Sequence, residues 1–160
     1  MFEFSTDLDV KSTPAQTFDH VARGFFEHHG LWDPTVISMR KTSDGPVGVG
    51  TTGIEERRFG RSRQKAAFKV TEFEPDRRFA WESTSGPAHQ QADLTIEERP
   101  GGARLHVHVR LTPASLGTRL FMPLMRSMLD KNLRAHTEGI RKALDADAEG
   151  SMPREASPST

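Results

Sequence analysis

The chain has 160 residues, enough for one domain that buries a hydrophobic core. Its 22 basic and 22 acidic side chains give a formal net charge of zero, which argues against nucleic-acid binding driven by bulk charge. Cysteine is absent, which excludes disulfides, thiol catalysis and cysteine-ligated metals, and no apolar run is long enough to span a membrane. We therefore expect a cytoplasmic protein without stable membrane insertion.

The N-terminal segment predicts a strand followed by helical structure. Phe2–Val10 alternates apolar and polar residues with the period of a half-buried strand. Pro14 lies near the first position of a helix, and apolar residues at helical spacing continue it to Phe25. Because Gly24 interrupts this pattern, we expect two short helices, which end at Trp32-Asp33-Pro34.

The middle of the chain predicts only strands. Turn residues such as Gly60 and Glu74-Pro75-Asp76 separate apolar runs. The predicted strands cover about residues 36–41, 50–59, 62–74, 78–85, 88–98 and 104–112. Short turns between successive strands indicate an antiparallel meander.

The segment from about residue 115 to residue 146 predicts one long amphipathic helix. Its apolar stripe consists of Phe121, Met122, Met125, Met128, Leu129, Leu133, Ile140 and Leu144. Three of the six methionines fall within this stripe, and methionine suits adaptable apolar surfaces. A single helix of this length needs a large apolar partner, which a sheet wrapped around it would supply, with a hollow between the two.

Several segments resemble the polyketide cyclase/dehydrase and lipid-transport family of the START-related superfamily. The matching segments are residues 14–21, Trp32-Asp33-Pro34, residues 42–51, residues 70–81 and residues 101–105, followed by the long helix. The resemblance covers about residues 2–146. It implies an α+β helix-grip fold, in which a curled antiparallel sheet of six to seven strands surrounds the C-terminal helix and encloses a hydrophobic cavity.

This resemblance defines the expected domain. We expect a helix-grip ligand-binding domain over residues 1–147. Residues 148–160 are rich in Ser, Pro, Glu and Ala and predict a disordered tail. The superfamily includes lipid carriers, hormone receptors and aromatase/cyclases, so the fold alone does not specify a reaction.

The cavity wall should combine large apolar side chains with a few polar ones. The candidate ligand-binding residues are Phe25, Trp32, Phe68, Trp81, Phe121, Met122, Met125, Leu129, Asn132 and His136. Most residues of this kind are plain core, and in a helix-grip fold core and pocket wall are the same surface. His136 and Asn132 could orient a ligand carbonyl or hydroxyl, and His136 is also a candidate general acid or base; alternatively, His136 is hydrogen-bonded to backbone or flanks the sheet edge.

The run from Glu55 to Arg58 contains two acids and two bases on one strand. If Ile54 faces inward, Glu56 and Arg58 enter the cavity, and Glu56 becomes a second catalytic candidate. If Phe59 faces inward, Glu55 and Arg57 enter instead. The sequence leaves both registers open, along with a sheet edge at which both pairs are solvated.

No metal site or cofactor is expected. His106 and His108 alternate on one strand and could share a metal, but they lie on its predicted outer face without a clear third ligand. Glu27-His28-His29 offers no better set, and Gly48-x-Gly50 lacks the third glycine and the following helix of a dinucleotide site.

Three functions remain open. The first is binding or transport of a small hydrophobic molecule, such as a lipid, a polyketide or an aromatic metabolite. The second is an aromatase/cyclase or dehydratase that uses an acid or base in the cavity, and the third is an interaction module without a usable cavity. The partner we expect is therefore a small hydrophobic molecule, and a homodimer is one arrangement that the sequence allows.

Overall fold

The first fifth of the chain forms a strand followed by three short helical segments. The computed structural model describes residues 1–150. Strand β1 (Phe2–Val10) leads into helix α1 (Pro14–Phe18), the π-helix η1 (Asp19–Arg23) and helix α2 (Phe25–Trp32). Gly24, where the sequence predicts a break, is the N-cap of α2.

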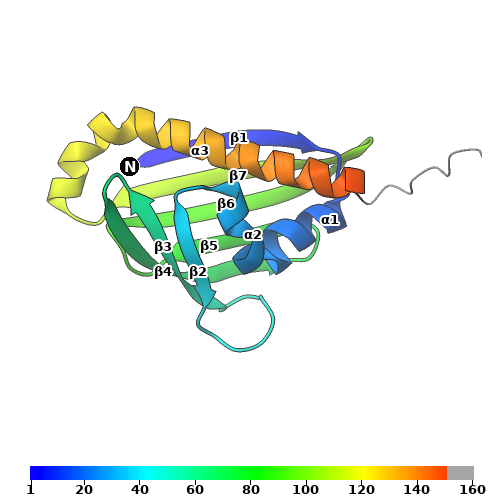
Figure 1. Ribbon diagram of the computed structural model, residues 1–160, viewed down its shortest axis with the longest axis horizontal. Coiled ribbons are helices and arrows are strands. Elements are labelled where there is room, and N and C mark those ends of the chain that lie inside the picture. The colour runs from blue at the N-terminus through cyan, green and yellow to red at the C-terminus, as the bar shows by residue number, and fades with distance from the viewer. Residues whose placement is uncertain (151–160) are drawn as a thin grey trace, which may run out of the picture.

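Six further strands complete one antiparallel sheet with the order β1-β7-β6-β5-β4-β3-β2 (Figure 1). They are β2 (Val36–Lys41), β3 (Thr52–Phe59), β4 (Ser62–Glu74), β5 (Arg78–Ser83), β6 (Ala88–Arg99) and β7 (Gly102–Pro113). The strands from β2 to β7 form the predicted meander, and β1 pairs with β7 at one edge. The predicted helix-grip architecture is confirmed.

The core lies between the concave face of this sheet, the short helices and the C-terminal half of the last helix. Alternate residues of β7, among them Leu105, Val107 and Val109, are buried there as their period predicts. They pack with fully buried side chains such as Phe25 and Phe79. Each fully buried side chain of this size contributes about 1.5–3 kcal/mol to stability.

Helix α3 (Leu116–Gly150) runs along the concave face (Figure 1). Its C-terminal half is anchored to the segment after β1, where the Ser12 hydroxyl donates to the Leu144 carbonyl over 2.9 Å and the Lys11 amide donates to Asp145 Oδ1 over 3.0 Å. Residues 148–150, predicted as tail, are helical, and residues 151–160 lie outside the described residues. Within residues 1–150, no helix is both long enough and apolar enough to cross a membrane.

The N-terminal half of α3 is packed very differently. The buried residues of the helix are Thr137, Ile140 and Leu144, all in its second half. Pro123 lies inside the first half, where its ring removes one backbone hydrogen bond, and the first turns curve away from the axis of the rest (Figure 1). The long helix is therefore firmly packed at one end and loosely packed at the other.

Candidate functional site

A cavity of about 470 Å³ lies between α3 and the concave face of the sheet. Of the ten candidate ligand-binding residues, eight line it: Trp32, Trp81, Phe121, Met122, Met125, Leu129, Asn132 and His136. The other two candidates, Phe25 and Phe68, are core residues instead. Phe25 packs edge-on against Phe68, with 5.6 Å between ring centroids, behind the cavity wall.

The cavity has an open end and a closed end. Exposed lining residues mark the opening, which lies between the first half of α3 (Phe121), the β3–β4 hairpin (Arg58, Lys65) and the loop after β5 (Pro87). Buried lining residues mark the closed end under the second half of α3. Because the loosely packed half of α3 covers the opening, a ligand can reach the cavity without disturbing the core.

The register of β3 places a charged pair inside the cavity. Glu55 and Arg57 line it, which is the register expected if Phe59 faces inward. Glu56 points away from the cavity and forms ion pairs with Arg63 at 3.5 Å and Lys65 at 3.8 Å. Glu56, the second catalytic candidate, therefore lies outside the cavity lining, and Glu55 lies within it.

Asp33 organises the closed end of the cavity. Its Oδ1 accepts hydrogen bonds from the amide of Thr35 at 2.8 Å and the hydroxyl of Thr35 at 2.7 Å, so the turn after α2 fixes the carboxylate. Its Oδ2 accepts from Arg57 Nη1 at 2.6 Å and lies 3.3 Å from Nδ1 of His136. Burial alone would raise the pKa of Asp33, but His136 and Arg57 outweigh it and hold that pKa well below its usual range.

Glu55 forms the second half of this polar cluster. Its Oε1 accepts from Arg57 Nε at 2.7 Å, and its Oε2 lies 3.4 Å from Nε2 of His29. Burial raises its pKa, whereas His29 and the Arg57 charge lower it, and the net result is a pKa of about 2. Both carboxylates are therefore ionised at neutral pH, and Arg57 bridges them.

The two histidines of the cluster differ in environment. His29 is buried, and burial lowers its pKa, so its ring is neutral at neutral pH. Neither of its ring nitrogens makes a full hydrogen bond within residues 1–150. His136 faces the ionised Asp33 through Nδ1, so that nitrogen carries the proton and Nε2 is free to accept a hydrogen bond whenever the ring is neutral.

Trp32 connects this cluster to the end of α3. Its indole Nε1 donates to Nε2 of His20 at 2.9 Å, and Nδ1 of His20 lies 2.8 Å from Oδ2 of Asp147. Helix α3 approaches the backbone of Trp32 closely because position 139 is glycine: a Cβ at Gly139 would lie 2.5 Å from the Trp32 carbonyl oxygen. The wall residue Trp32 is thus held by its indole and by backbone packing.

Asp33 and His29 were not among the candidate site residues. In the sequence, Asp33 stands out only as part of the Trp32-Asp33-Pro34 motif, although an acid next to a large aromatic residue at a helix end is a usable signal. His29 stands out only as a possible metal ligand. Their roles depend on side chains of β3, α2, the turn after α2 and α3 meeting in one place, and no local sequence pattern shows that meeting.

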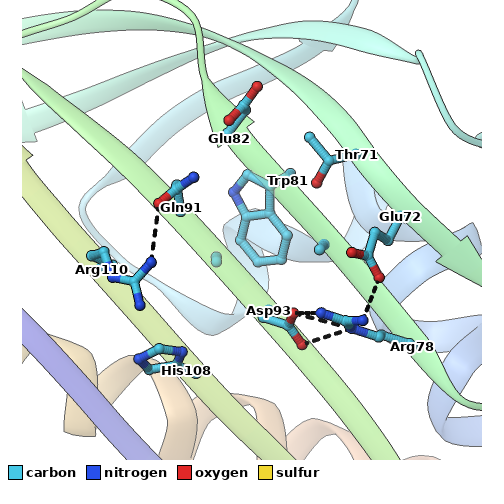
Figure 2. Close-up of a pocket in the computed structure, with 11 residues that line it drawn as sticks. Thr71, Glu72, Arg78, Trp81, Glu82, Gln91, Asp93, His108 and Arg110 are labelled. Carbon is cyan, nitrogen blue, oxygen red and sulfur yellow. Dashed lines mark hydrogen bonds and ion pairs between the residues drawn. The ribbon is translucent and has the colours of Figure 1, made fainter.

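A second, shallower hollow of about 340 Å³ lies on the outer face of the sheet (Figure 2). There Arg78 lies between Glu72 and Asp93, and Arg110 reaches the side-chain oxygen of Gln91 (Figure 2). Its charges pair mainly with one another, which leaves few groups to bind a ligand. Within residues 1–150, no cluster of three or more His, Asp or Glu side chains has the arrangement of a metal site.

Known proteins share this fold. The family model described as polyketide cyclase / dehydrase and lipid transport matches residues 1–145. Three solved structures are similar. TTHA0849 from Thermus thermophilus has 13% sequence identity and a TM-score of 0.73, and the match covers 95% of this chain and 100% of that one. Ara h 8.0201 has 13% identity and a TM-score of 0.71, with 94% of this chain and 99% of that one covered, and the Zhui aromatase/cyclase from a Streptomyces species has 10% identity and a TM-score of 0.74, with 96% of each chain covered. No curated protein matches the sequence. At these identities the structural likeness shows the fold alone.

Proposed function

Because the chain belongs to the polyketide cyclase/dehydrase and lipid-transport family, we propose that it binds a small hydrophobic molecule in the cavity under α3. Suitable ligands are a lipid, a polyketide or another aromatic metabolite. The observation that carries this proposal is a cavity of about 470 Å³ with an apolar wall and a polar closed end. Small-molecule sites combine these features in this size range.

The apolar body of the ligand would lie against α3. Met122, Met125 and Leu129 offer a flexible apolar wall that can adjust to ligands of different shape. Burial of ligand carbon would drive binding at about 25 cal/mol per Å² removed from water. Trp81 would contact the ligand from the sheet side.

The polar end of the ligand would lie against Arg57 and His136. The hydrogen bonds of Arg57 to the described residues use Nε and Nη1, which leaves Nη2 to donate to a ligand oxygen. Two ionised carboxylates, Asp33 and Glu55, share this single guanidinium, so an additional anion would be repelled. We therefore expect an uncharged hydroxyl or carbonyl at this position, and weaker binding of a carboxylate ligand than of the matching alcohol.

Native mass spectrometry of the purified protein tests this function. We expect a bound small molecule on the wild-type chain and its loss from Met125→Trp, because the larger side chain fills the cavity. Ser127→Trp places the same indole side chain at an exposed position of α3 and should keep the ligand. If wild type and both variants all lack a bound molecule, and none binds added long-chain alcohol, the proposal is wrong.

A specific observation also supports an enzyme of the cyclase or dehydratase type. An ionised carboxylate behind Nδ1 of a histidine, as in Asp33 and His136, is an arrangement that supports a general base at Nε2. If the protein turns over a cyclisable substrate, His136→Ala should lower kcat by about 100-fold or more. His108→Ala, on the outer sheet face, is the matched control, and equal kcat values for both variants would exclude His136 as the catalyst.

A further inference from the structure

The first half of α3 carries a ridge of apolar side chains that faces solvent. Leu116, Leu120, Leu124 and Met128 follow one another at intervals of four residues, so they lie along one face of the helix. Their exposed fractions are 81%, 79%, 81% and 43%, and the adjacent cavity residue Phe121 is 59% exposed. Single exposed apolar residues are ordinary, but five large ones together indicate an interaction surface.

The β3–β4 hairpin adds positive charge at the same end of the molecule. Residues 58–65 contain four exposed basic side chains and no acidic one: Arg58, Arg61, Arg63 and Lys65. Arg63 and Lys65 share Glu56 as an ion-pair partner, so the four bases still exceed the nearby acid. Among the described residues, Arg58 and Arg61 have no ion-pair partner. The tip of this hairpin and the first turns of α3 lie at one end of the fold (Figure 1), and both segments line the open end of the cavity.

The first half of α3 reinforces this charge. Residues 116–129 include Arg119 and Arg126 and no aspartate or glutamate. The whole chain has a net charge of zero, so the positive charge at this end is a local property. A helix that combines large apolar side chains with basic residues suits the headgroup region of a bilayer, where apolar burial and attraction to anionic lipid act together.

We propose that the apolar ridge of α3 and the basic β3–β4 hairpin form a docking surface for an anionic phospholipid bilayer. Docking would place the open end of the cavity against the membrane, so that a hydrophobic ligand could pass between lipid and protein without crossing water. The attachment is peripheral: the ridge enters the interface, and the chain does not cross the bilayer.

Charge favours a bilayer over a second copy of the chain as the occupant. A two-fold dimer built on this end would bring the basic hairpins and the arginines of two α3 helices together. The acid near the hairpin tip that lies outside the cavity, Glu56, is already paired with Arg63 and Lys65 of its own chain. An anionic bilayer instead offers negative charge across the whole contact. The same argument predicts that added salt weakens docking.

Vesicle flotation tests the docking surface directly. We expect the wild-type chain to float with vesicles of phosphatidylcholine mixed with phosphatidylglycerol, and to float poorly with phosphatidylcholine alone. Leu120→Ser with Leu124→Ser should lower the partition coefficient by about tenfold or more, since two ridge side chains are lost. Arg61→Glu with Arg63→Glu should lower it by a similar factor on the mixed vesicles.

Two matched controls test whether these effects are local. Leu31→Ser removes a leucine that is 71% exposed on α2, and Arg77→Glu reverses a charge at the β4–β5 turn, at the opposite end of β4; both should float like wild type.

Absence of flotation with mixed vesicles would overturn the proposal. If the wild-type chain self-associates in sedimentation and the Leu120 and Leu124 changes abolish this, the ridge binds a second copy of the chain and the proposal is wrong. If the ridge binds only an acidic protein, that protein is the partner and the proposal is also wrong. The vesicle test does not depend on the cavity ligand, so its failure would leave the proposed function intact.

Discussion

The two halves of α3 perform different tasks within one continuous helix. The second half buries Thr137, Ile140 and Leu144 and is tied to the segment after β1 by hydrogen bonds. The first half buries no side chain and spans the open end of the cavity. Buried contacts are therefore concentrated at one end of the helix, and the proposed ligand would enter past the loosely packed other end.

The largest expected contrast comes from removing a leucine in each half. Leu144→Ala should destabilise the protein by about 2–5 kcal/mol, because it empties a fully buried position. Leu124→Ala removes an exposed side chain and should change stability by less than about 0.5 kcal/mol. Chemical denaturation of both variants measures the contrast, and equal losses would contradict the division of the helix.

Two glycines sharpen the same comparison. In Gly139→Ala the new Cβ meets the Trp32 carbonyl oxygen at 2.5 Å, so we expect a loss of about 1–3 kcal/mol. In Gly117→Ala the nearest atom is the Ser115 hydroxyl oxygen at 3.9 Å, and the better helix propensity of alanine should stabilise by about 0.5–1 kcal/mol. Thermal denaturation shows whether each variant is stabilised or destabilised. If Gly139→Ala stabilised the protein, α3 and the end of α2 would not be in close contact at this position.

The anchored half should also respond to acid through His20. Burial lowers the pKa of His20, and the neighbouring His28 lowers it further, below its ordinary value of 6.5. As the pH falls below that value, the unfolded chain binds a proton that the folded chain does not, so stability decreases by up to about 1.4 kcal/mol per pH unit. In His20→Gln, the free energy of unfolding should depend less on pH between the ordinary pKa of histidine and the lower pKa of His20 in the folded protein. Urea denaturation of wild type and variant at several pH values in this range measures the effect. An identical change of unfolding free energy with pH in both proteins would contradict the role given to His20.

The smallest expected effect on stability concerns Pro123. Pro123→Ala restores a backbone donor inside the loosely packed half and should slow amide exchange in the first turns of α3. Because this half contributes little to the core, global stability should change by less than about 0.5 kcal/mol. Hydrogen exchange with mass spectrometry measures the local effect, and a large global change would show that the first half is part of the folding core.

Sequence patterns predicted the elements better than the site. Period-2 alternation placed Leu105, Val107 and Val109 on the inner face of β7, and the apolar stripe of α3 contains the methionines that line the cavity. Such patterns predict structure well because each one reports which face of a single helix or strand is buried. The apolar stripe alone does not predict that its first half covers an opening, because that depends on which parts of the sheet lie opposite each half of the helix.

The polar cluster was harder to predict because its members come from separate elements. The sequence allows either Glu55 and Arg57 or Glu56 and Arg58 on the inner face, since four consecutive charged residues give no period-2 signal. Asp33 enters the cluster from the turn after α2 and His136 from α3, and their contact depends on the close approach at Gly139. Phe25 and Phe68 are candidates for the cavity wall as well as for the core, because core and wall have the same composition and sequence does not separate them.

The central claim is that the cavity binds a small hydrophobic molecule, and the two tryptophans of the chain report on it directly. Trp32 and Trp81 both line the cavity, so a bound neutral probe such as N-phenyl-1-naphthylamine should quench their fluorescence. We predict saturable quenching at one probe per chain, reversed by a long-chain alcohol more effectively than by the matching fatty acid. Quenching that never saturates, or its absence at probe concentrations that fill known hydrophobic sites, would contradict the account.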